Sequence, residues 1–235
     1  MGDQGRPAVP RRPGAAGILR GMSSSTRAIA GSPESRAVAA ERMTFFTDAV
    51  LAIAMTLLAL DLPVPEGATN AEVLHSFGEH RGEYMAFLIS FLVIAAHWRS
   101  HHGLYRYVGS MTPRLSGLNT AWLLTQVVTP FATKVITGES AFETRFIFYA
   151  VVQTLAGGLF LLMLRQIRRH RLYRDDTPPE VLTDVGTGAL AMALAFVVSI
   201  PAALFTHWAY LCWAALPLAD SVLRGLRRHR TASPA

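Results

Sequence analysis

Histidines at the end of one apolar segment have the clearest spacing for chemistry. His97 and His101 stand four residues apart in "HWRSHHGLYRY", so a helix would place both on one face. Two imidazoles at this spacing can share a zinc ion. No HExxH motif or nearby carboxylate accompanies them, and Trp and His side chains are common anchors at a membrane boundary. We therefore expect neither a metal site nor a cofactor.

A second candidate is the pair of charges that opens the first apolar segment, "ERMTFFTDAVLAIAMTLLALDLPVP". On an ideal helix Arg42 and Asp48 lie about 120° apart in direction and about 9 Å apart along the axis, so they are poorly placed to pair. They are either ordinary interfacial charges, where Asp suits the start of a helix, or anchors whose partners come from other helices. The spacing alone leaves both interpretations open.

The same segment carries a narrow stripe of side chains. Ile53, Thr56 and Leu60 fall within an arc of about 60° on the helical wheel, and Phe46 continues the stripe toward the start of the helix. Asp48 points about 140° away from Ile53 on this wheel. From spacing alone, contact with lipid or with the protein core is the commoner role of such a stripe.

Composition indicates the elements that must position these residues. The 235-residue chain is 51% hydrophobic and 16% charged, against about a quarter charged in soluble domains. Its apolar residues fall in continuous runs of about 20, which predicts an all-α polytopic membrane protein rather than a β-barrel. Pro130 and Pro201 lie inside spans, and Gly157 and Gly158 are expected to let helices pack closely. Six transmembrane helices are predicted: Thr44–Leu62, Tyr84–Tyr105, Leu118–Thr137, Arg145–Leu164, Val185–Phe205 and Trp208–Val222.

The distribution of basic residues predicts the orientation of these helices. Arg-rich segments alternate with acidic or balanced ones, so the positive-inside rule places both termini in the cytoplasm. We expect a disordered basic tail over 1–40, a six-helix domain over 41–224 and a basic tail over 225–235. The formal charge of +6 is scattered between the spans, which argues against nucleic acid as a partner. No nucleophile with a general base and no phosphate loop is present, so no enzyme is expected.

Two segments resemble the transmembrane protein 175 family, the endolysosomal potassium channels and their bacterial relatives. "RMTFFTD", followed by "AVLAIAMTLL", resembles the Arg-x-x-x-Phe-Ser-Asp signature of that family through Arg42, Phe46 and Asp48, with Thr47 in place of Ser. "HWRSHHGLYRY" is similar to the Trp-x-x-His-His segment that ends the second span in bacterial members. The resemblance covers the six-span body and leaves the first 40 residues outside it.

The resemblance implies roles for individual residues. In that family the first helix lines the pore, and an apolar residue five positions after the signature Asp forms the constriction. That position is Ile53, with Thr56 and Leu60 as the adjoining layers. The resemblance also implies a network that docks the first helix onto the second, made by the signature residues together with His97, Trp98, His101 and His102.

The function implied is that of a homotetrameric, potassium-permeable cation channel in the plasma membrane of a prokaryote. Its partners would be potassium ions, the lipid bilayer and three further copies of the chain. Selection would arise where a narrow apolar ring makes the ion shed part of its water, because the sequence has no Thr-Val-Gly-Tyr-Gly filter loop. The alternative is a proton-conducting or proton-coupled membrane transporter that uses the histidines as a relay.

Overall fold

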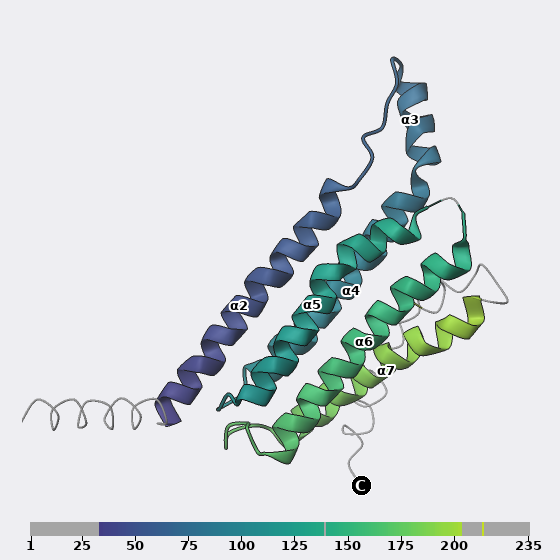
Figure 1. The fold of residues 1–235 in the computed structure, drawn as a ribbon. Helices are drawn as coiled ribbons and strands as arrows, with labels where there is room; N and C mark the ends of the chain where they lie inside the picture. Colours follow the sequence, from purple (N-terminus) through teal and green to yellow (C-terminus); the bar gives the residue numbers. More distant parts are fainter. Residues whose placement is uncertain (1–32, 139, 204–212, 214–235) are drawn as a thin grey trace, which may run out of the picture.

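The computed structural model describes residues 33–138, 140–203 and 213, and these residues form an all-helical bundle (Figure 1). The predicted all-α fold is therefore confirmed. Five of the helices coincide with predicted spans, whereas the sixth predicted span lies outside the described residues except for Trp213. The helices are α2 (Pro33–Leu60), α3 (Asn70–Glu79), α4 (Arg81–Tyr105), α5 (Pro113–Ile136), α6 (Phe142–Arg169) and α7 (Pro179–Ala203).

Three of the described helices are long and apolar enough to cross a membrane: Ala37–Leu60 within α2, the whole of α6 and the whole of α7. Helices α4 and α5 are of similar length, with 25 and 24 residues. They carry most of the polar side chains that are buried in the described part of the bundle. The polar content of α4 and α5 is thus a property of the bundle interior, to which the candidate site belongs.

The helix boundaries differ from those predicted. Helix α2 begins at Pro33, so residues 33–40, which the sequence placed in a disordered tail, are helical. Helix α6 continues past Leu164 to Arg169 because its basic last turn extends beyond the apolar run. Apolar length thus located the spans but not the polar turns that prolong them. The remainder of the two predicted tails, 1–32 and 225–235, lies outside the described residues.

Helix α3 was not predicted, because its segment was interpreted only as an acidic connection between two spans. Its start has a local physical cause. The side chain of Thr69, the N-cap residue, accepts a hydrogen bond from the Glu72 backbone N–H at 3.3 Å, and the Glu72 carboxylate accepts one from Ala68 N–H at 2.7 Å. This reciprocal arrangement is close to a capping box, which satisfies donors that a helix start leaves unpaired.

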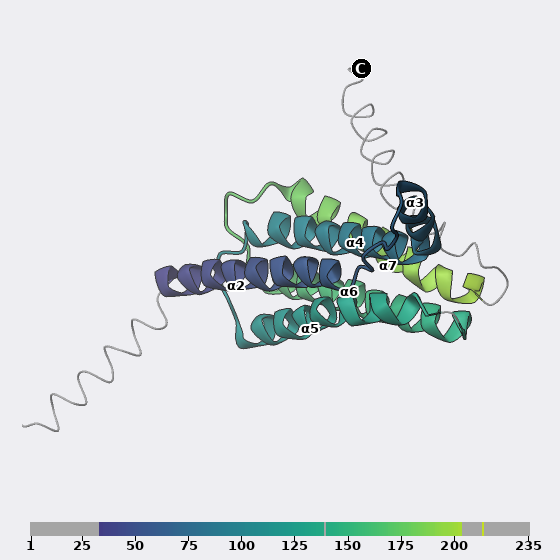
Figure 2. The same ribbon diagram turned by 90° about the horizontal axis from the view of Figure 1, so that it is seen from above.

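Helix α2 packs against both α4 and α5 and lies between them when the bundle is seen from above (Figure 2). Helix α6 packs against α5 on one side and α7 on the other, so α7 lies away from α2 (Figures 1 and 2). At one end of the bundle the connections after α4 and α6 are joined, because Gly109 N–H donates to Leu172 O and Arg174 N–H donates to Tyr107 O, both at 2.8 Å. The ends of α4 and α6 are thereby held together.

The two adjacent glycines of α6 have different surroundings. A Cβ atom at Gly157 would lie 2.7 Å from Cβ of Ala193 on α7, closer than real Cβ contacts. A Cβ atom at Gly158 would meet nothing within 4 Å. Of these two glycines, Gly157 is therefore the one that the close approach of α6 and α7 requires.

Candidate pore helix and docking network

Helix α2 has one buried face and one exposed face. Leu51, Ala54 and Leu58 are almost completely buried against the rest of the bundle. On the other face Ile53 is 59% exposed and Leu60 is 80% exposed. The stripe that the helical wheel identified therefore lies on the outside of a single chain, where it is free to contact lipid or another copy.

Thr56 belongs to the exposed face and interrupts its apolar character. Its hydroxyl donates a hydrogen bond to the Ile53 carbonyl oxygen at 2.8 Å. This bond uses the hydroxyl hydrogen and leaves the oxygen able to accept. The exposed face consequently presents an apolar side chain, an oxygen acceptor and a second apolar side chain in succession along the helix.

Asp48 contacts two aromatic side chains of α4. Trp98 Nε1 donates a hydrogen bond to Asp48 Oδ1 at 3.0 Å. His102 Nδ1 lies 3.8 Å from Asp48 Oδ2, a distance that makes an ion pair when the imidazole is protonated. The partners of this carboxylate thus come from a neighbouring helix and not from Arg42.

Thr47, one residue earlier, is fully buried and contacts α5 instead. Asn119 Nδ2 donates to Thr47 Oγ1 at 3.0 Å, and Asn119 Oδ1 lies 2.8 Å from His101 Nε2. The carbonyl oxygen can only accept, so the second bond requires the His101 proton on Nε2. The His101 ring is stacked between Tyr105 and Trp122, with centroid distances of 3.9 and 4.9 Å. One hydrogen-bonded row therefore joins α2, α5 and α4.

His97 is buried one turn further into the bundle. It is 4% exposed, its ring meets Trp122 edge-on at 6.1 Å, and neither ring nitrogen has a hydrogen-bond partner within the described ranges. The two histidines at the i, i+4 spacing therefore have different surroundings, because His101 is hydrogen-bonded to Asn119 and His97 is not. In residues 33–138, 140–203 and 213, no group of three or more His, Cys, Asp and Glu side chains is arranged to hold a metal ion.

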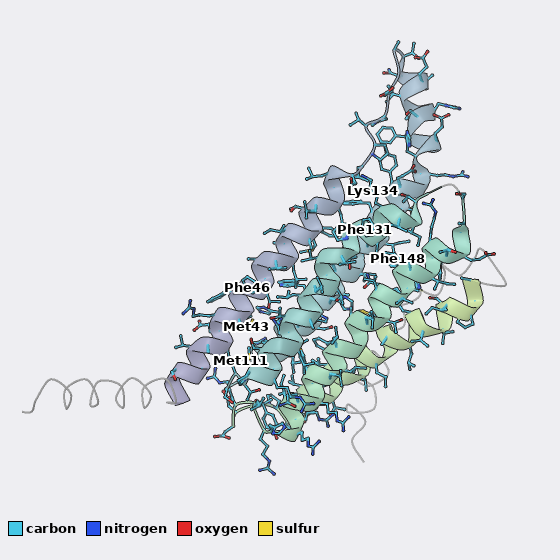
Figure 3. The ribbon with its side chains drawn as sticks, in the orientation of Figure 1. Met43, Phe46, Met111, Phe131, Lys134 and Phe148 are labelled. Carbon is cyan, nitrogen blue, oxygen red and sulfur yellow. The ribbon has the colours of Figure 1, made fainter. Side chains whose placement is uncertain are left out.

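Two signature residues lie outside these contacts. Arg42 is exposed and makes no hydrogen bond or ion pair with any residue that the structure describes. Phe46 is 57% exposed on α2 (Figure 3). The structure thus brings together Thr47, Asp48, Trp98 and both His101 and His102, whereas Arg42 and Phe46 face outward in the single chain.

A second link holds the other end of α2. Lys134 of α5, labelled in Figure 3, donates to Asp61 Oδ1 at 2.8 Å, and both side chains are partly exposed. Asp61 directly follows Leu60, so this ion pair stands at the end of the exposed stripe.

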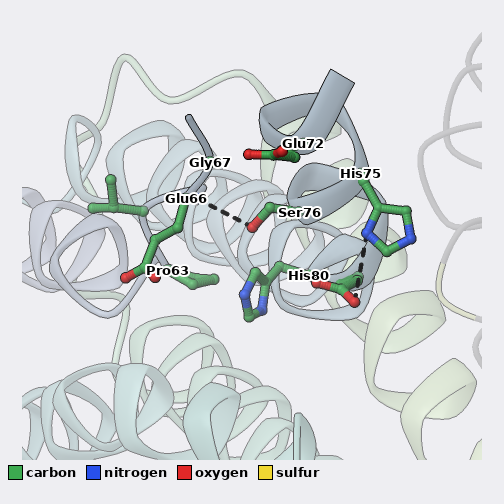
Figure 4. Close-up of a pocket in the computed structure, with 9 residues that line it drawn as sticks. Pro63, Glu66, Gly67, Glu72, His75, Ser76 and His80 are labelled. Atoms are coloured by element: carbon green, nitrogen blue, oxygen red, sulfur yellow. Dashed lines mark hydrogen bonds and ion pairs between the residues drawn. The ribbon is translucent and has the colours of Figure 1, made fainter. Parts of the chain in front are cut away.

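The segment after α2 and helix α3 enclose a polar pocket of about 830 Å³ (Figure 4). Within this pocket Ser76 Oγ accepts a hydrogen bond from Glu66 N–H at 3.2 Å, and His75 Nδ1 lies 3.6 Å from Glu79 Oε1. None of the signature residues lines this pocket. It belongs to the connection between two spans and not to the exposed face of α2.

Sequence reasoning missed the polar residues that α5 contributes. Asn119, Gln126 and Thr129 are fully buried, and Thr133 is 7% exposed. Their spacing of seven, three and four residues places them on one face of α5. Polar side chains at helical spacing within an apolar span are the signal that could have found them, because such groups face the bundle interior.

Comparison with known proteins shows which family this part of the chain resembles. Residues 42–130 match the family model described as endosomal/lysosomal potassium channel TMEM175. This match contains α4 and the signature of α2, together with most of α5. The resemblance to the transmembrane protein 175 family that the sequence indicated is therefore confirmed.

Curated relatives match a similar length of the chain. A potassium channel of Streptomyces collinus is 36% identical over 95 residues, which cover 40% of this chain and 46% of the relative. A potassium channel of Chryseobacterium sp. is 33% identical over 101 residues, covering 43% and 50% respectively. The endosomal/lysosomal proton channel TMEM175 of Gallus gallus is 38% identical over 86 residues, covering 33% of this chain and 17% of the relative. The chain thus spans about half the length of the bacterial relatives that it matches.

The fold is shared with a solved structure. The crystal structure of a lysosomal potassium-selective channel TMEM175 homolog from Chamaesiphon minutus superposes with a TM-score of 0.64 at 19% identity. The match covers 78% of this chain and 98% of that one. The likeness shows a shared fold.

Proposed function

We propose that the chain forms a homotetrameric, potassium-permeable cation channel whose constriction is made by Ile53 of α2. The observation that carries the proposal is the two-sided character of α2. One face is fixed to α4 and α5 through the Thr47 and Asp48 contacts. The opposite face is left open along its length and carries the Ile53, Thr56 and Leu60 stripe.

The position of α2 in the bundle supports an assembly around this helix. Helix α2 is at the edge of the bundle, with α6 and α7 on the far side (Figure 1). Copies arranged about an axis beside α2 would bring their exposed faces together and leave α7 toward lipid. The named bacterial relatives are potassium channels, which favours an aqueous path along that axis over a purely lipid-facing stripe. We place both termini in the cytoplasm of a prokaryotic cell, on the distribution of arginine.

Selectivity would arise from the cost of dehydration at the apolar ring. A hydrophobic constriction offers an ion no replacement for the water that it sheds. Potassium holds its hydration shell less tightly than sodium and is penalised less. The Thr56 oxygen, which remains an acceptor because its hydrogen is bonded to the Ile53 carbonyl, would ligate the ion beside the ring.

The test is ion flux from liposomes that contain the purified full-length protein and a potassium gradient, with sodium replacing potassium in parallel. We expect potassium flux to exceed sodium flux, and Ile53→Asn to reduce that ratio because a polar ring hydrates the constriction. Leu124→Asn is the matched control, since Leu124 of α5 is similarly exposed at 64% against 59% for Ile53. A potassium-to-sodium ratio that is unchanged in Ile53→Asn contradicts the proposed constriction.

A second candidate function, proton conduction, is favoured by one specific observation. Besides the His101 row, the bundle buries further polar side chains that are hydrogen-bonded to one another: Gln153 Nε2 donates to Thr129 Oγ1 at 3.2 Å, and Ser90 bonds to both Thr133 and Tyr149 at 2.7 and 3.0 Å. Chickens and zebrafish each have a relative named as a proton channel. Conduction through these groups predicts that His101→Gln, which can still donate a hydrogen bond to Asn119 Oδ1, abolishes proton flux and spares potassium flux. Equal proton flux in the variant and the wild type rejects the histidine relay.

A further inference from the structure

We propose that an anionic phospholipid binds between the last turns of α6 and the first turns of α7, with its phosphate held by arginine side chains. A groove of about 630 Å³ lies between these helices. Its walls include Arg165, Arg168 and Arg169 together with Leu164 and Leu190. The groove therefore combines a cluster of positive charge with an apolar floor, as the headgroup and acyl chain of a phospholipid require.

The charge of the groove favours an anion. All three arginine side chains are exposed, and the ion pairs found within the described ranges include none of them. The adjoining turns of α7 carry two carboxylates, Glu180 and Asp184, so the arginines remain in excess. Guanidinium groups bind phosphate oxygens in a two-pronged geometry that exposed arginines near a membrane can adopt.

The groove lies at the level of the membrane where lipid headgroups are expected. The apolar run of α6 ends at Leu164 and its basic turn begins at Arg165, so the arginines stand where hydrocarbon gives way to headgroups. Leu190 and Leu194 of α7 are 46% and 52% exposed and continue from the groove toward the apolar part of that helix. Basic pockets between helices on the cytoplasmic side are a recurrent site for anionic headgroups.

Within the part of the chain that the structure describes, the groove lies on the side of the bundle away from α2. Helices α6 and α7 lie on the opposite side of the bundle from α2 (Figure 2). In an assembly around α2 they would face the bilayer. The lipid site rests on the membrane orientation in the proposed function but not on ion conduction, and it would recur once in every copy.

The experiment is native mass spectrometry of the full-length protein in detergent, titrated with phosphatidylglycerol or with phosphatidylcholine of the same acyl chains. We expect phosphatidylglycerol to bind more tightly, and R165Q/R168Q/R169Q to weaken it by at least about tenfold. The control, R106Q/R114Q/R174Q, removes the same number of arginines from the same end of the bundle. An equal loss in both triple variants, or displacement of the lipid by inorganic phosphate alone, overturns the proposal.

A second pair of variants keeps every arginine and therefore the topology signal. Thr183 lines the groove on α7. Thr183→Glu would place a carboxylate beside the arginines and compete with the phosphate, whereas Thr183→Gln adds a neutral group of the same size. We expect only Thr183→Glu to lose selectivity for phosphatidylglycerol, and retention of that selectivity in Thr183→Glu counts against the site. The binding assay does not depend on ion flux. A protein that selects phosphatidylglycerol but conducts no ions would therefore refute the proposed channel and leave the lipid site standing.

Discussion

Replacing Asn119 with Leu removes the side chain that joins α2 to α4 through α5. The change eliminates two hydrogen bonds and leaves the Thr47 hydroxyl and His101 Nε2 buried without that partner. A hydrogen bond between membrane helices contributes about 0.6 kcal/mol on average, and a buried one in soluble proteins up to about 1.5 kcal/mol. We therefore expect Asn119→Leu to lower the free energy of unfolding by about 1–3 kcal/mol.

A double-mutant cycle isolates the bond between α2 and α5. Thr47→Val keeps the shape of Thr47 but removes its hydroxyl, and should cost about 0.6–1.5 kcal/mol alone. Because Asn119→Leu has already broken that bond, the combined loss should fall short of the sum by a similar amount. Reversible unfolding in mixed micelles, followed by circular dichroism, measures all four proteins. The control cycle pairs Thr47→Val with Gln153→Leu, whose buried side chain bonds to Thr129.

Two outcomes of this cycle would refute the reasoning. Losses that add within about 0.3 kcal/mol in the Thr47 and Asn119 pair would show that the bond contributes nothing. A coupling of equal size in the control pair would show that the effect is general to the bundle. Thr47→Ser keeps the hydroxyl and should retain the coupling to Asn119, which separates the hydrogen bond from the packing of the methyl group.

The remaining predictions concern helix packing and the end of the stripe. Gly157→Ala should be about 1–3 kcal/mol less stable than Gly158→Ala, because both gain the same backbone term and only Gly157 meets α7; equal unfolding free energies for the two variants contradict this. Lys134→Met should leave Asp61 unpaired and raise potassium flux by at least about twofold at low salt. The gain should vanish near 1 M salt, where the screening length is about 3 Å, and a gain that persists there would reject the electrostatic explanation.

The existence of five helices could be predicted because membrane thickness imposes a minimum apolar length that the sequence displays directly. The ends of these helices could not be predicted in this way. The first turns of α2 and the last turn of α6 are polar, and they are helical because the backbone hydrogen bonds continue beyond the apolar run. Helix α3 was missed for a related reason. Its signal was the capping box at Thr69 and Glu72, which is local and was present in the sequence, and not an apolar run.

In the candidate site, too, the sequence predicts features that depend on neighbouring residues and misses contacts between residues far apart along the chain. The direction of Ile53 relative to Asp48 follows from the helical repeat alone, and the structure places Ile53 and Leu60 on the exposed face that this repeat defines. The partner of Thr47 does not follow, because Asn119 is 72 residues away along the chain. Only the packing of α2 against α4 and α5 brings these two residues together.

Two attachments at adjacent residues determine how α2 is rotated about its own axis. Thr47 and Asp48 point about 100° apart on a helix, and Thr47 is bonded to α5 while Asp48 is bonded to α4. The buried apolar face of α2 already restricts its rotation, and two polar attachments in different directions restrict it further. Because Ile53 follows Asp48 by about 7.5 Å along a continuous helix, that rotation also sets the direction of Ile53. The docking network therefore acts on the proposed constriction through the aim of α2, without any of its members facing the ion.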